Sequence, residues 1–140
     1  MSQQRPLPEI TAEDAEFWRA AKEHRLVLPR CRDCGLVWFP PYARCTRCAS
    51  SGIEWIAASG RGRIWGWIEM HRPYIPWFAP ALPYNVVLVR LDEGAFMYSN
   101  VVGARYEDLR ADLPVEVVFE DVDGTVALPK FRLVDAAGGE

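Results

Sequence analysis

The chain has 140 residues, half of them hydrophobic, and a formal charge of −3 at pH 7. This is enough for one ordinary domain or two small ones, and no run approaches the roughly 18 apolar residues of a membrane span. The net acidity argues against wholesale phosphate binding, but residues 30–63 carry six basic and two acidic side chains, and residues 107–123 carry one basic and seven acidic ones. We therefore expect a cytoplasmic protein whose first half attracts anions more than its second.

A helix is predicted after an extended arm at residues 1–10. It should run from Thr11 to about His24, because threonine is a good N-cap and the acidic residues that follow it suit the positive end of the helix dipole. Phe17 and Trp18 give this helix a large apolar face. We expect that face to pack on the chain's own metal-binding segment or against another subunit, so both residues are candidates for a partner surface.

The chain has four cysteines, arranged as two Cys-x-x-Cys pairs ten residues apart: Cys31, Cys34, Cys45 and Cys48. Two such knuckles supply the four thiolates of a closed tetrahedral Zn²⁺ site, in which each Zn–S distance is about 2.3 Å. Because four protein ligands leave no open coordination position, we expect the zinc to be structural. Short strands are predicted before and after the knuckles, at residues 25–29 and 53–56.

Other uses of the cysteines were considered. Gly35 follows the first knuckle and lets backbone amides approach the sulfurs, whereas Ala49 stands where the second knuckle would ideally have glycine. Disulfides would imply an oxidising compartment, and the N-terminus has neither the basic nor the apolar region of a secretion signal. A redox pair normally stands alone near a βαβ pattern. Tetrathiolate iron would use the same ligands, so the choice between zinc and iron stays open.

A barrel is predicted after a flexible joint at residues 59–62. Five strand signals follow, with a helical turn between the third and fourth. The strands cover residues 63–71, 86–91, 95–102, 115–120 and 125–133, and the turn covers 106–109. This is the order of an OB-fold, a small, partly open barrel. The predicted divisions are 1–59 for the helix and ribbon, 60–134 for the barrel and 135–140 for a flexible tail.

Side-chain alternation predicts how the first two of these strands face. In the first strand, Ile64 and Ile68 should share one face, and Trp65 and Trp67 the other. The second strand is continuously apolar over residues 86–89, so we expect it to be buried on both sides.

The loop between these two strands is unusually apolar for a loop. It contains four prolines and the bulky side chains of Tyr74, Ile75, Trp77 and Phe78. Loops are normally exposed, so this one would present a hydrophobic patch to water unless something covers it. We interpret it as a ligand or partner surface, with folding back over its own barrel as the alternative.

Motifs along nearly the whole chain resemble those of the acyl-CoA-associated zinc-ribbon/OB-fold proteins. In chain order they are Phe17-Trp18, the four-cysteine ribbon, Gly60-Arg61-Gly62, His71-Arg72-Pro73, Pro83-Tyr84, Leu91-Asp92-Glu93-Gly94, Ser99-Asn100-Val101-Val102-Gly103 and Leu128-Pro129-Lys130-Phe131. The resemblance implies a mainly β fold, in which an N-terminal helix and a rubredoxin-like zinc ribbon precede a five-stranded OB-fold barrel.

The resemblance also implies a function. Members of this family are typically non-catalytic partners of thiolase-superfamily enzymes: acetyl-CoA acetyltransferases, thiolase-like aldolases of steroid side-chain degradation and related acyltransferases. Some are fused to a hydratase chain, whereas this one is expected to be freestanding. It would join a thiolase-like enzyme in a hetero-oligomer and help to bind or channel acyl-CoA. Candidate phosphate ligands are Arg61, Arg63, His71 and Arg72, because guanidinium groups bind phosphate in a bidentate way.

Two other classes of function were weighed. Zinc ribbons and OB barrels also bind single-stranded nucleic acid, and Trp65 and Trp67 could stack bases. Net acidity and the scarcity of lysine, present only as Lys22 and Lys130, make that alternative less favourable. An independent enzyme is disfavoured because the sequence offers no nucleophile with a paired base, no open metal site and no glycine-rich phosphate loop.

Overall fold

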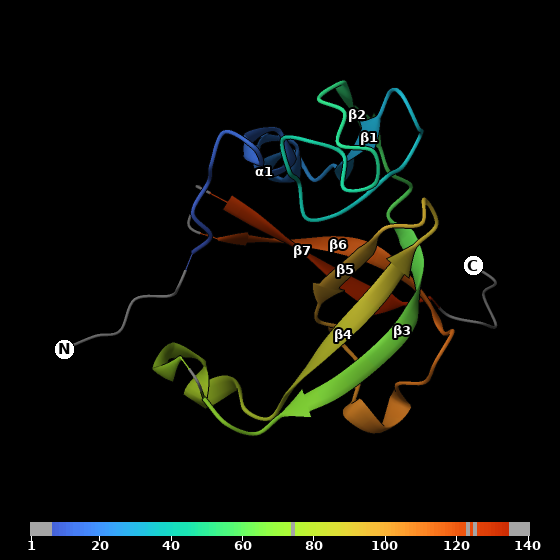
Figure 1. Ribbon diagram of the computed structural model, residues 1–140. Helices are drawn as coiled ribbons and strands as arrows, with labels where there is room; N and C mark the ends of the chain where they lie inside the picture. Colours follow the sequence, from blue (N-terminus) through green and yellow to red (C-terminus); the bar gives the residue numbers. More distant parts are fainter. Residues whose placement is uncertain (1–6, 74, 123, 125, 135–140) are drawn as a thin grey trace.

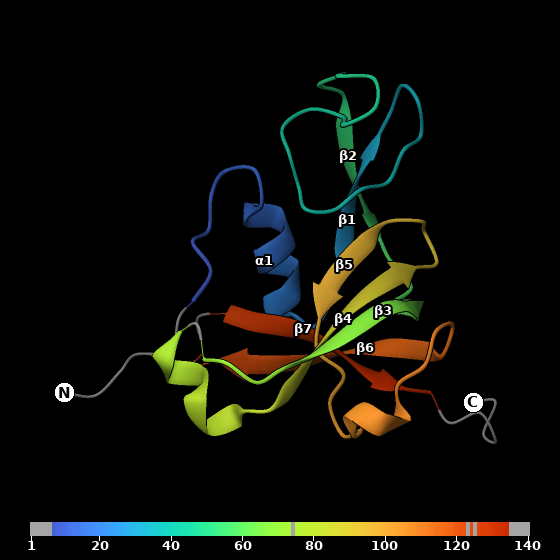
Figure 2. The same ribbon diagram turned by 60° about the horizontal axis from the view of Figure 1, so that its bottom comes forward.

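The computed structural model describes residues 7–73, 75–122, 124 and 126–134. A small two-stranded unit stands on a curled five-stranded sheet, and one helix lies beside both (Figures 1 and 2). No helix in the described part of the chain is long and apolar enough to cross a membrane. The elements are α1 (Ala15–Lys22), β1 (Val27–Cys31), β2 (Ile53–Ala57), β3 (Arg61–Met70), η1 (Pro76–Ala81), β4 (Tyr84–Leu91), β5 (Phe96–Ser99), η2 (Tyr106–Asp108), β6 (Pro114–Val122) and β7 (Val126–Leu133).

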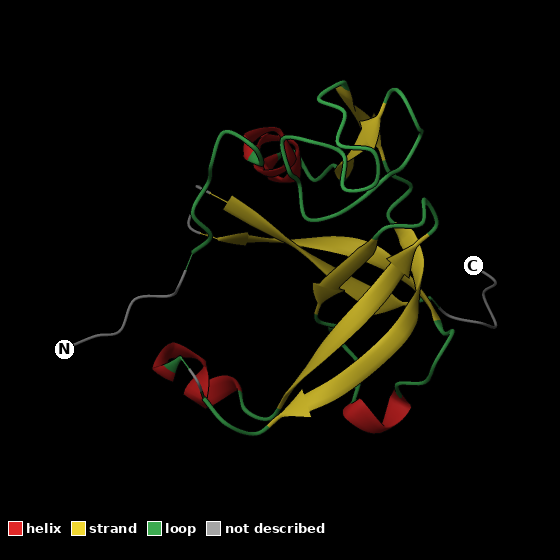
Figure 3. Cartoon of the chain, in the orientation of Figure 1, coloured by secondary structure: helices red, strands yellow, loops and turns green. Residues whose placement is uncertain are grey.

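The larger sheet has the connectivity predicted for an OB-fold. Its strand order is β5-β4-β3-β6-β7, with every neighbouring pair antiparallel. A parallel bridge between Val101 and Phe131 brings the two edges of the sheet together. The 3₁₀ helix η2 lies between the third and fourth barrel strands, as predicted. Both 3₁₀ helices lie at the end of the barrel opposite the two-stranded unit (Figure 3). The predicted mainly β fold is confirmed.

A β-bulge makes the predicted alternation of β3 wrong beyond its fourth residue. The pairing with β4 shifts register between Ile64 and Gly66, and Trp67 then lies opposite the buried Val87. An extra residue in one strand exchanges the two faces, because side chains alternate with a period of two. Ile64 is therefore buried but Ile68 is exposed. Trp65 points outward and Trp67 packs against the core.

The two-sided burial predicted for β4 is also wrong. Val87, Val89 and Leu91 are buried, whereas the residues between them are half-buried or, at Arg90, exposed. One face of β4 therefore forms the core and the other lies on the outside of the barrel. Residues 86–89 form a continuous apolar run because the outer face of β4 is itself apolar. The strand is not buried on both sides.

The N-terminal helix is shorter than predicted and packs differently. The Asp14 carboxylate accepts bonds from the backbone N–H of Thr11, at 2.7 Å, and from its hydroxyl, which forms a turn before the helix begins. His24 has a positive φ of 60° and lies beyond the helix end. The helix contacts β7 and β1, and Phe17 is 2% exposed within the barrel core. The helix therefore docks mainly on its own barrel.

The glycines of the predicted flexible joint are tightly packed. Gly60 has a φ of +79°, and its carbonyl accepts a bond from the backbone N–H of Val117 at 2.7 Å. Gly62 is buried where the backbone of β3 passes close to Arg90. Conformation at Gly60 and close approach at Gly62 therefore account for these two glycines.

Candidate metal centre and ligand pocket

The four cysteine sulfurs converge on one point. The Sγ atoms lie within 4.8 Å of one another, with Cys31 and Cys48 at 3.5 Å and Cys34 and Cys45 at 3.6 Å. A tetrahedral site with Zn–S bonds of about 2.3 Å has sulfurs about 3.8 Å apart, so the arrangement fits a tetrathiolate metal. The predicted ligand set is brought together, and it forms a metal-binding site.

The two knuckles have nearly the same backbone geometry. In the first, the N–H of Cys34 points to the sulfur of Cys31 at 3.4 Å; in the second, the N–H of Cys48 points to the sulfur of Cys45 at 3.4 Å. The residue after each knuckle is left-handed, with φ of 82° at Gly35 and 65° at Ala49. Ala49 therefore adopts the conformation for which glycine is better suited.

This backbone geometry predicts opposite effects for two exchanges. Gly35→Ala should lower the free energy of unfolding of the metal-loaded protein by about 1 kcal/mol, because alanine is strained at positive φ. No atom lies within 4 Å of the added Cβ, so no clash contributes. Ala49→Gly should be neutral or slightly stabilising. Denaturant titration measures both, and equal destabilisation by the two variants would contradict the role of φ.

Hydrogen bonds and crowding shift the pKa values of the Cys34 and Cys48 thiols in opposite directions. The backbone N–H of Leu36, with help from Arg47, lowers the pKa of Cys34 to about 6. The backbone N–H of Ser50 favours the Cys48 thiolate, but the neighbouring thiols, first of all Cys31, and partial loss of solvation outweigh it and raise the pKa of Cys48 to about 12. Four crowded sulfurs oppose full ionisation in the absence of a cation, and a bound metal ion reverses that balance.

Two side chains that the sequence analysis did not single out hold the knuckles together. The Arg47 guanidinium donates to the Cys34 carbonyl at 2.9 Å, and the Ser50 hydroxyl donates to Asp33 in the opposite knuckle. On the inner side, Trp38 is buried against the cysteines. Sequence spacing identifies the ligands but not these contacts, because they depend on how the loop between the knuckles returns.

The four predicted phosphate ligands do not form one site. Arg61 and Arg63 lie at the start of β3, and His71 and Arg72 follow its far end, a separation of about 30 Å for a ten-residue strand. Arg63 donates to the carbonyl of Asp112 at 2.8 Å, and His71 lies 3.0 Å from the Glu69 carboxylate. The four candidates therefore form two separate pairs at opposite ends of β3, as their positions along the predicted strand imply.

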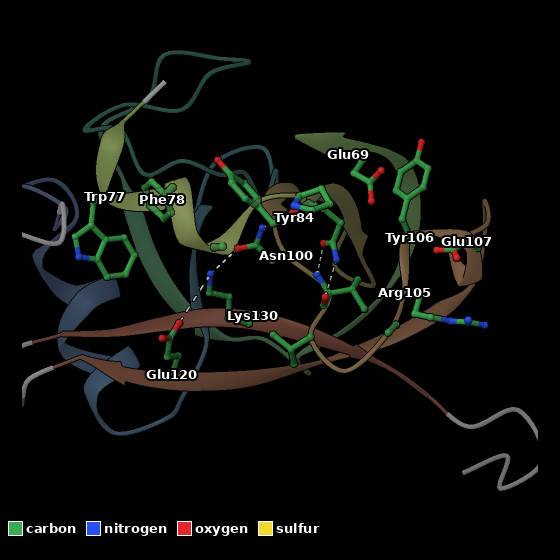
Figure 4. Close-up of a pocket in the computed structure, with 16 residues that line it drawn as sticks. Glu69, Trp77, Phe78, Tyr84, Asn100, Arg105, Tyr106, Glu107, Glu120 and Lys130 are labelled. Atoms are coloured by element: carbon green, nitrogen blue, oxygen red, sulfur yellow. Dashed lines mark hydrogen bonds and ion pairs between the residues drawn. The ribbon is translucent and has the colours of Figure 1, made fainter. Parts of the chain in front are cut away.

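The aromatic loop forms one wall of a pocket of about 590 Å³ at the end of the barrel (Figure 4). Trp77 and Phe78 lie on η1, and their rings meet edge to face at 5.1 Å. Phe78 also contacts Tyr84, with ring centroids 5.8 Å apart. Ile75 is exposed and does not line this pocket, and Tyr74 lies outside the described residues. Part of the predicted loop surface is thus turned toward a cavity.

A polar network lies across the pocket from these rings. Lys130 on β7 donates to the side-chain oxygen of Asn100 and lies 3.9 Å from the Glu120 carboxylate. The Asn100 side-chain amide donates to the backbone carbonyl of Asn85, and the Asn85 amide donates to the Val101 carbonyl at 2.8 Å. Lys130 and Asn100 belong to motifs that resemble the family's, and no contact between them was predicted. Their pairing depends on closure of the barrel, which spacing does not reveal.

An exposed apolar patch lies on the outer face of β3, β4 and β5. Trp65 and Tyr98 are 55% and 74% exposed, and Ile68 on β3 and Phe96 on β5 are exposed as well. Trp65 contacts Phe96 edge to face at 5.4 Å, and Arg90 lies over the Trp65 ring. Because the bulge turns Trp67 inward, the two tryptophans proposed to stack bases lie on different faces. Trp18, at the other predicted surface, is half-buried.

A four-sulfur metal site on a two-stranded ribbon, joined to a closed five-stranded barrel, defines a zinc-ribbon/OB-fold protein. Residues 18–54 match the family model described as the ChsH2 rubredoxin-like zinc ribbon domain, and residues 55–120 match the ChsH2 C-terminal OB-fold domain. The chain belongs to this ChsH2/DUF35 family. The resemblance inferred from its motifs is confirmed.

Individual relatives differ in length. The chain is 35% identical over 128 residues to a probable enoyl-CoA hydratase alpha subunit of Thermomonospora curvata, covering 91% of this chain but 40% of that one. It is 32% identical to a DUF35 domain-containing scaffold protein of Methanocaldococcus jannaschii, covering 75% of each. It also matches a solved chain titled "Ltp2-ChsH2(DUF35) aldolase", with 34% identity, a TM-score of 0.81 and coverage of 91% and 98%.

Proposed function

We propose that this chain is a non-catalytic accessory subunit of an acyl-CoA enzyme, and that its partner is a thiolase-superfamily enzyme, such as an acetyl-CoA acetyltransferase or a thiolase-like aldolase or acyltransferase. The subunit would act in the cytoplasm and help to bind or channel the acyl-CoA. The observation that carries the proposal is the similarity of this chain to the solved chain titled "Ltp2-ChsH2(DUF35) aldolase". The match covers 98% of that solved chain.

The chemistry of this chain supports an accessory role. All four cysteines face one metal site, and in the proposal the metal is zinc with a structural role. The two histidines are exposed and each contacts a carboxylate, His24 with Asp121 at 2.8 Å and His71 with Glu69 at 3.0 Å. The reacting groups would therefore come from the partner.

The outer apolar patch supports an interface. Large exposed aromatic side chains gathered on one face are typical of protein contacts, in which aromatic residues carry much of the binding energy. Tyr98 and Phe96 lie on β5, at an edge of the sheet order, where a partner can approach. We assign the enzyme contact to this patch, with the exposed part of the aromatic loop as a second contact.

Affinity capture of the tagged chain from its native cell extract tests the proposal. We expect a thiolase-like chain in the eluate, with acyl-CoA cleavage or condensation activity that depends on the accessory subunit. Tyr98→Glu should lower recovery of the partner about tenfold, because it places a charge in an apolar contact. Tyr42→Glu makes the same change on the exposed ribbon and is the matched control.

The possible outcomes separate the alternatives. Equal recovery with both glutamate variants would contradict the assigned patch but not the accessory role. Recovery of nucleic acid that is lost as salt is raised, with no enzyme present, would refute the accessory role. Size-exclusion mass measurement then gives the stoichiometry of the recovered complex.

A further inference from the structure

The pocket behind the aromatic loop is far larger than an acetyl group requires. Its volume of about 590 Å³ lies in the range of sites that enclose a drug-sized ligand. We propose that this pocket takes the acyl group of a bulky acyl thioester, and that the nucleotide end of the CoA stays outside it. The inference rests on the proposed function and specifies which part of the acyl-CoA this chain would hold.

The lining favours an apolar ligand. Trp77, Phe78 and Tyr84 form a continuous aromatic wall, and Val101 and Val102 also line the pocket. The two asparagines that line the pocket are bonded within the protein. The backbone N–H of Val101 donates to the Asn85 side chain at 2.7 Å, and Asn100 donates to the Asn85 carbonyl. Since these amides already have partners, burying a hydrocarbon beside them leaves no unmet hydrogen bond at these contacts.

The charges around the pocket oppose the nucleotide end. Three carboxylates line it, from Glu69, Glu107 and Glu120, against two cations, Arg105 and Lys130, which leaves a net charge of −1. Arg105 lies 3.6 Å from the Asp108 carboxylate, and Lys130 is bound by Asn100. Several phosphate charges would therefore meet net repulsion here. An uncharged thioester with its hydrocarbon group does not meet this repulsion.

Chain-length dependence is the first readout. Acetyl-, hexanoyl- and decanoyl-pantetheine, which lack the nucleotide, are titrated by calorimetry into the full, zinc-loaded chain. Affinity should rise about fourfold per added methylene, the factor that corresponds to about 0.8 kcal/mol of burial. Free CoA, which has the nucleotide but no acyl group, should not compete with decanoyl-pantetheine. Decanoate, equally long but ending in a carboxylate, should bind more weakly than the thioester.

Two alanine exchanges on the same 3₁₀ helix test the location. Ala81→Trp adds an indole at a position that lines the pocket, whereas Ala79→Trp makes the same change at an exposed position that does not. The first should weaken decanoyl-pantetheine binding about 60-fold, the loss expected if three buried methylenes are displaced from the cavity. The second should leave the affinity within about twofold, because it buries no part of the ligand site.

The acyl-pocket proposal can be overturned while the proposed accessory function still holds. Affinity that does not depend on chain length, equal weakening by both variants, or tighter binding of CoA or decanoate than of decanoyl-pantetheine would each overturn the acyl pocket. A chain that still captures a thiolase-like enzyme after such a result keeps its accessory role. Conversely, chain-length-dependent binding without any captured enzyme would leave an acyl-binding protein and refute the subunit role.

Discussion

Cys31→Ser should release the metal and unfold the loops of the ribbon while α1 and the barrel remain folded. Structural zinc contributes about 10–16 kcal/mol of binding free energy to small metal domains at neutral pH, and loss of one thiolate opens the closed site. The cysteines and Trp38 form a small core of their own, separate from the core that holds Phe17 and the barrel. Metal content by elemental analysis should fall from about one ion per chain to nearly none.

Thr46→Ala is the matched control, because Thr46 lies between two ligands and is itself exposed. It should retain the full metal content. Hydrogen exchange locates the unfolding: faster exchange should be confined to residues 31–53, and unchanged metal content in Cys31→Ser would contradict the ligand assignment. The same elemental analysis distinguishes zinc from iron. Acid should release the metal from the unaltered protein, because protons compete for the thiolates.

Gly62→Ala should destabilise the barrel by about 3 kcal/mol, near the upper end of ordinary overpacking effects. A Cβ at this position would lie 2.5 Å from the Arg90 carbonyl oxygen and 2.8 Å from Cγ1 of Val89. The first of these atoms is backbone in the paired strand β4, so relief requires the two central strands to separate. Thermal and denaturant unfolding measure the loss.

Gly66→Ala lies in the same strand and provides the matched comparison. An added Cβ meets no atom within 4 Å there, and the backbone is not left-handed. This variant should be neutral or stabilised by up to about 1 kcal/mol, because alanine lowers the entropy of the unfolded chain. Similar losses at the two positions would show that close approach at Gly62 is not the cause.

The metal site and the barrel order were predictable because both are encoded locally. The four cysteines have a spacing that fixes two turns, and turn residues separate the strand signals at Gly94 and Gly124. By contrast, the bulge at Trp65 could not be read from alternation. Before it, Ile64 follows the predicted pattern; after it, every side chain faces the opposite way.

The pocket at the end of the barrel was harder to predict than the metal site. The aromatic loop was identified, but Lys130 and Asn100 come from opposite edges of the closed sheet, about 30 residues apart in sequence. The candidate arginines were chosen for their charge, and the structure places Arg63 in the first part of β3 and Arg72 beyond its far end. The surface role given to Phe17 failed because the helix packs on the barrel, a long-range contact that amphipathicity alone does not specify.

Helix α1, strand β1 and the barrel share one hydrophobic core. This core determines at which residues a segment of the chain could be exchanged for that of a relative to make a chimera. Phe17 and Leu28 pack with Phe131, so a cut at residues 59/60 would separate side chains that bury one another. Arg30 and Glu54 face each other across β1 and β2, 3.2 Å apart, just below the sulfurs. A relative's metal loop spliced between these two residues would carry its own small core and leave the barrel's packing intact.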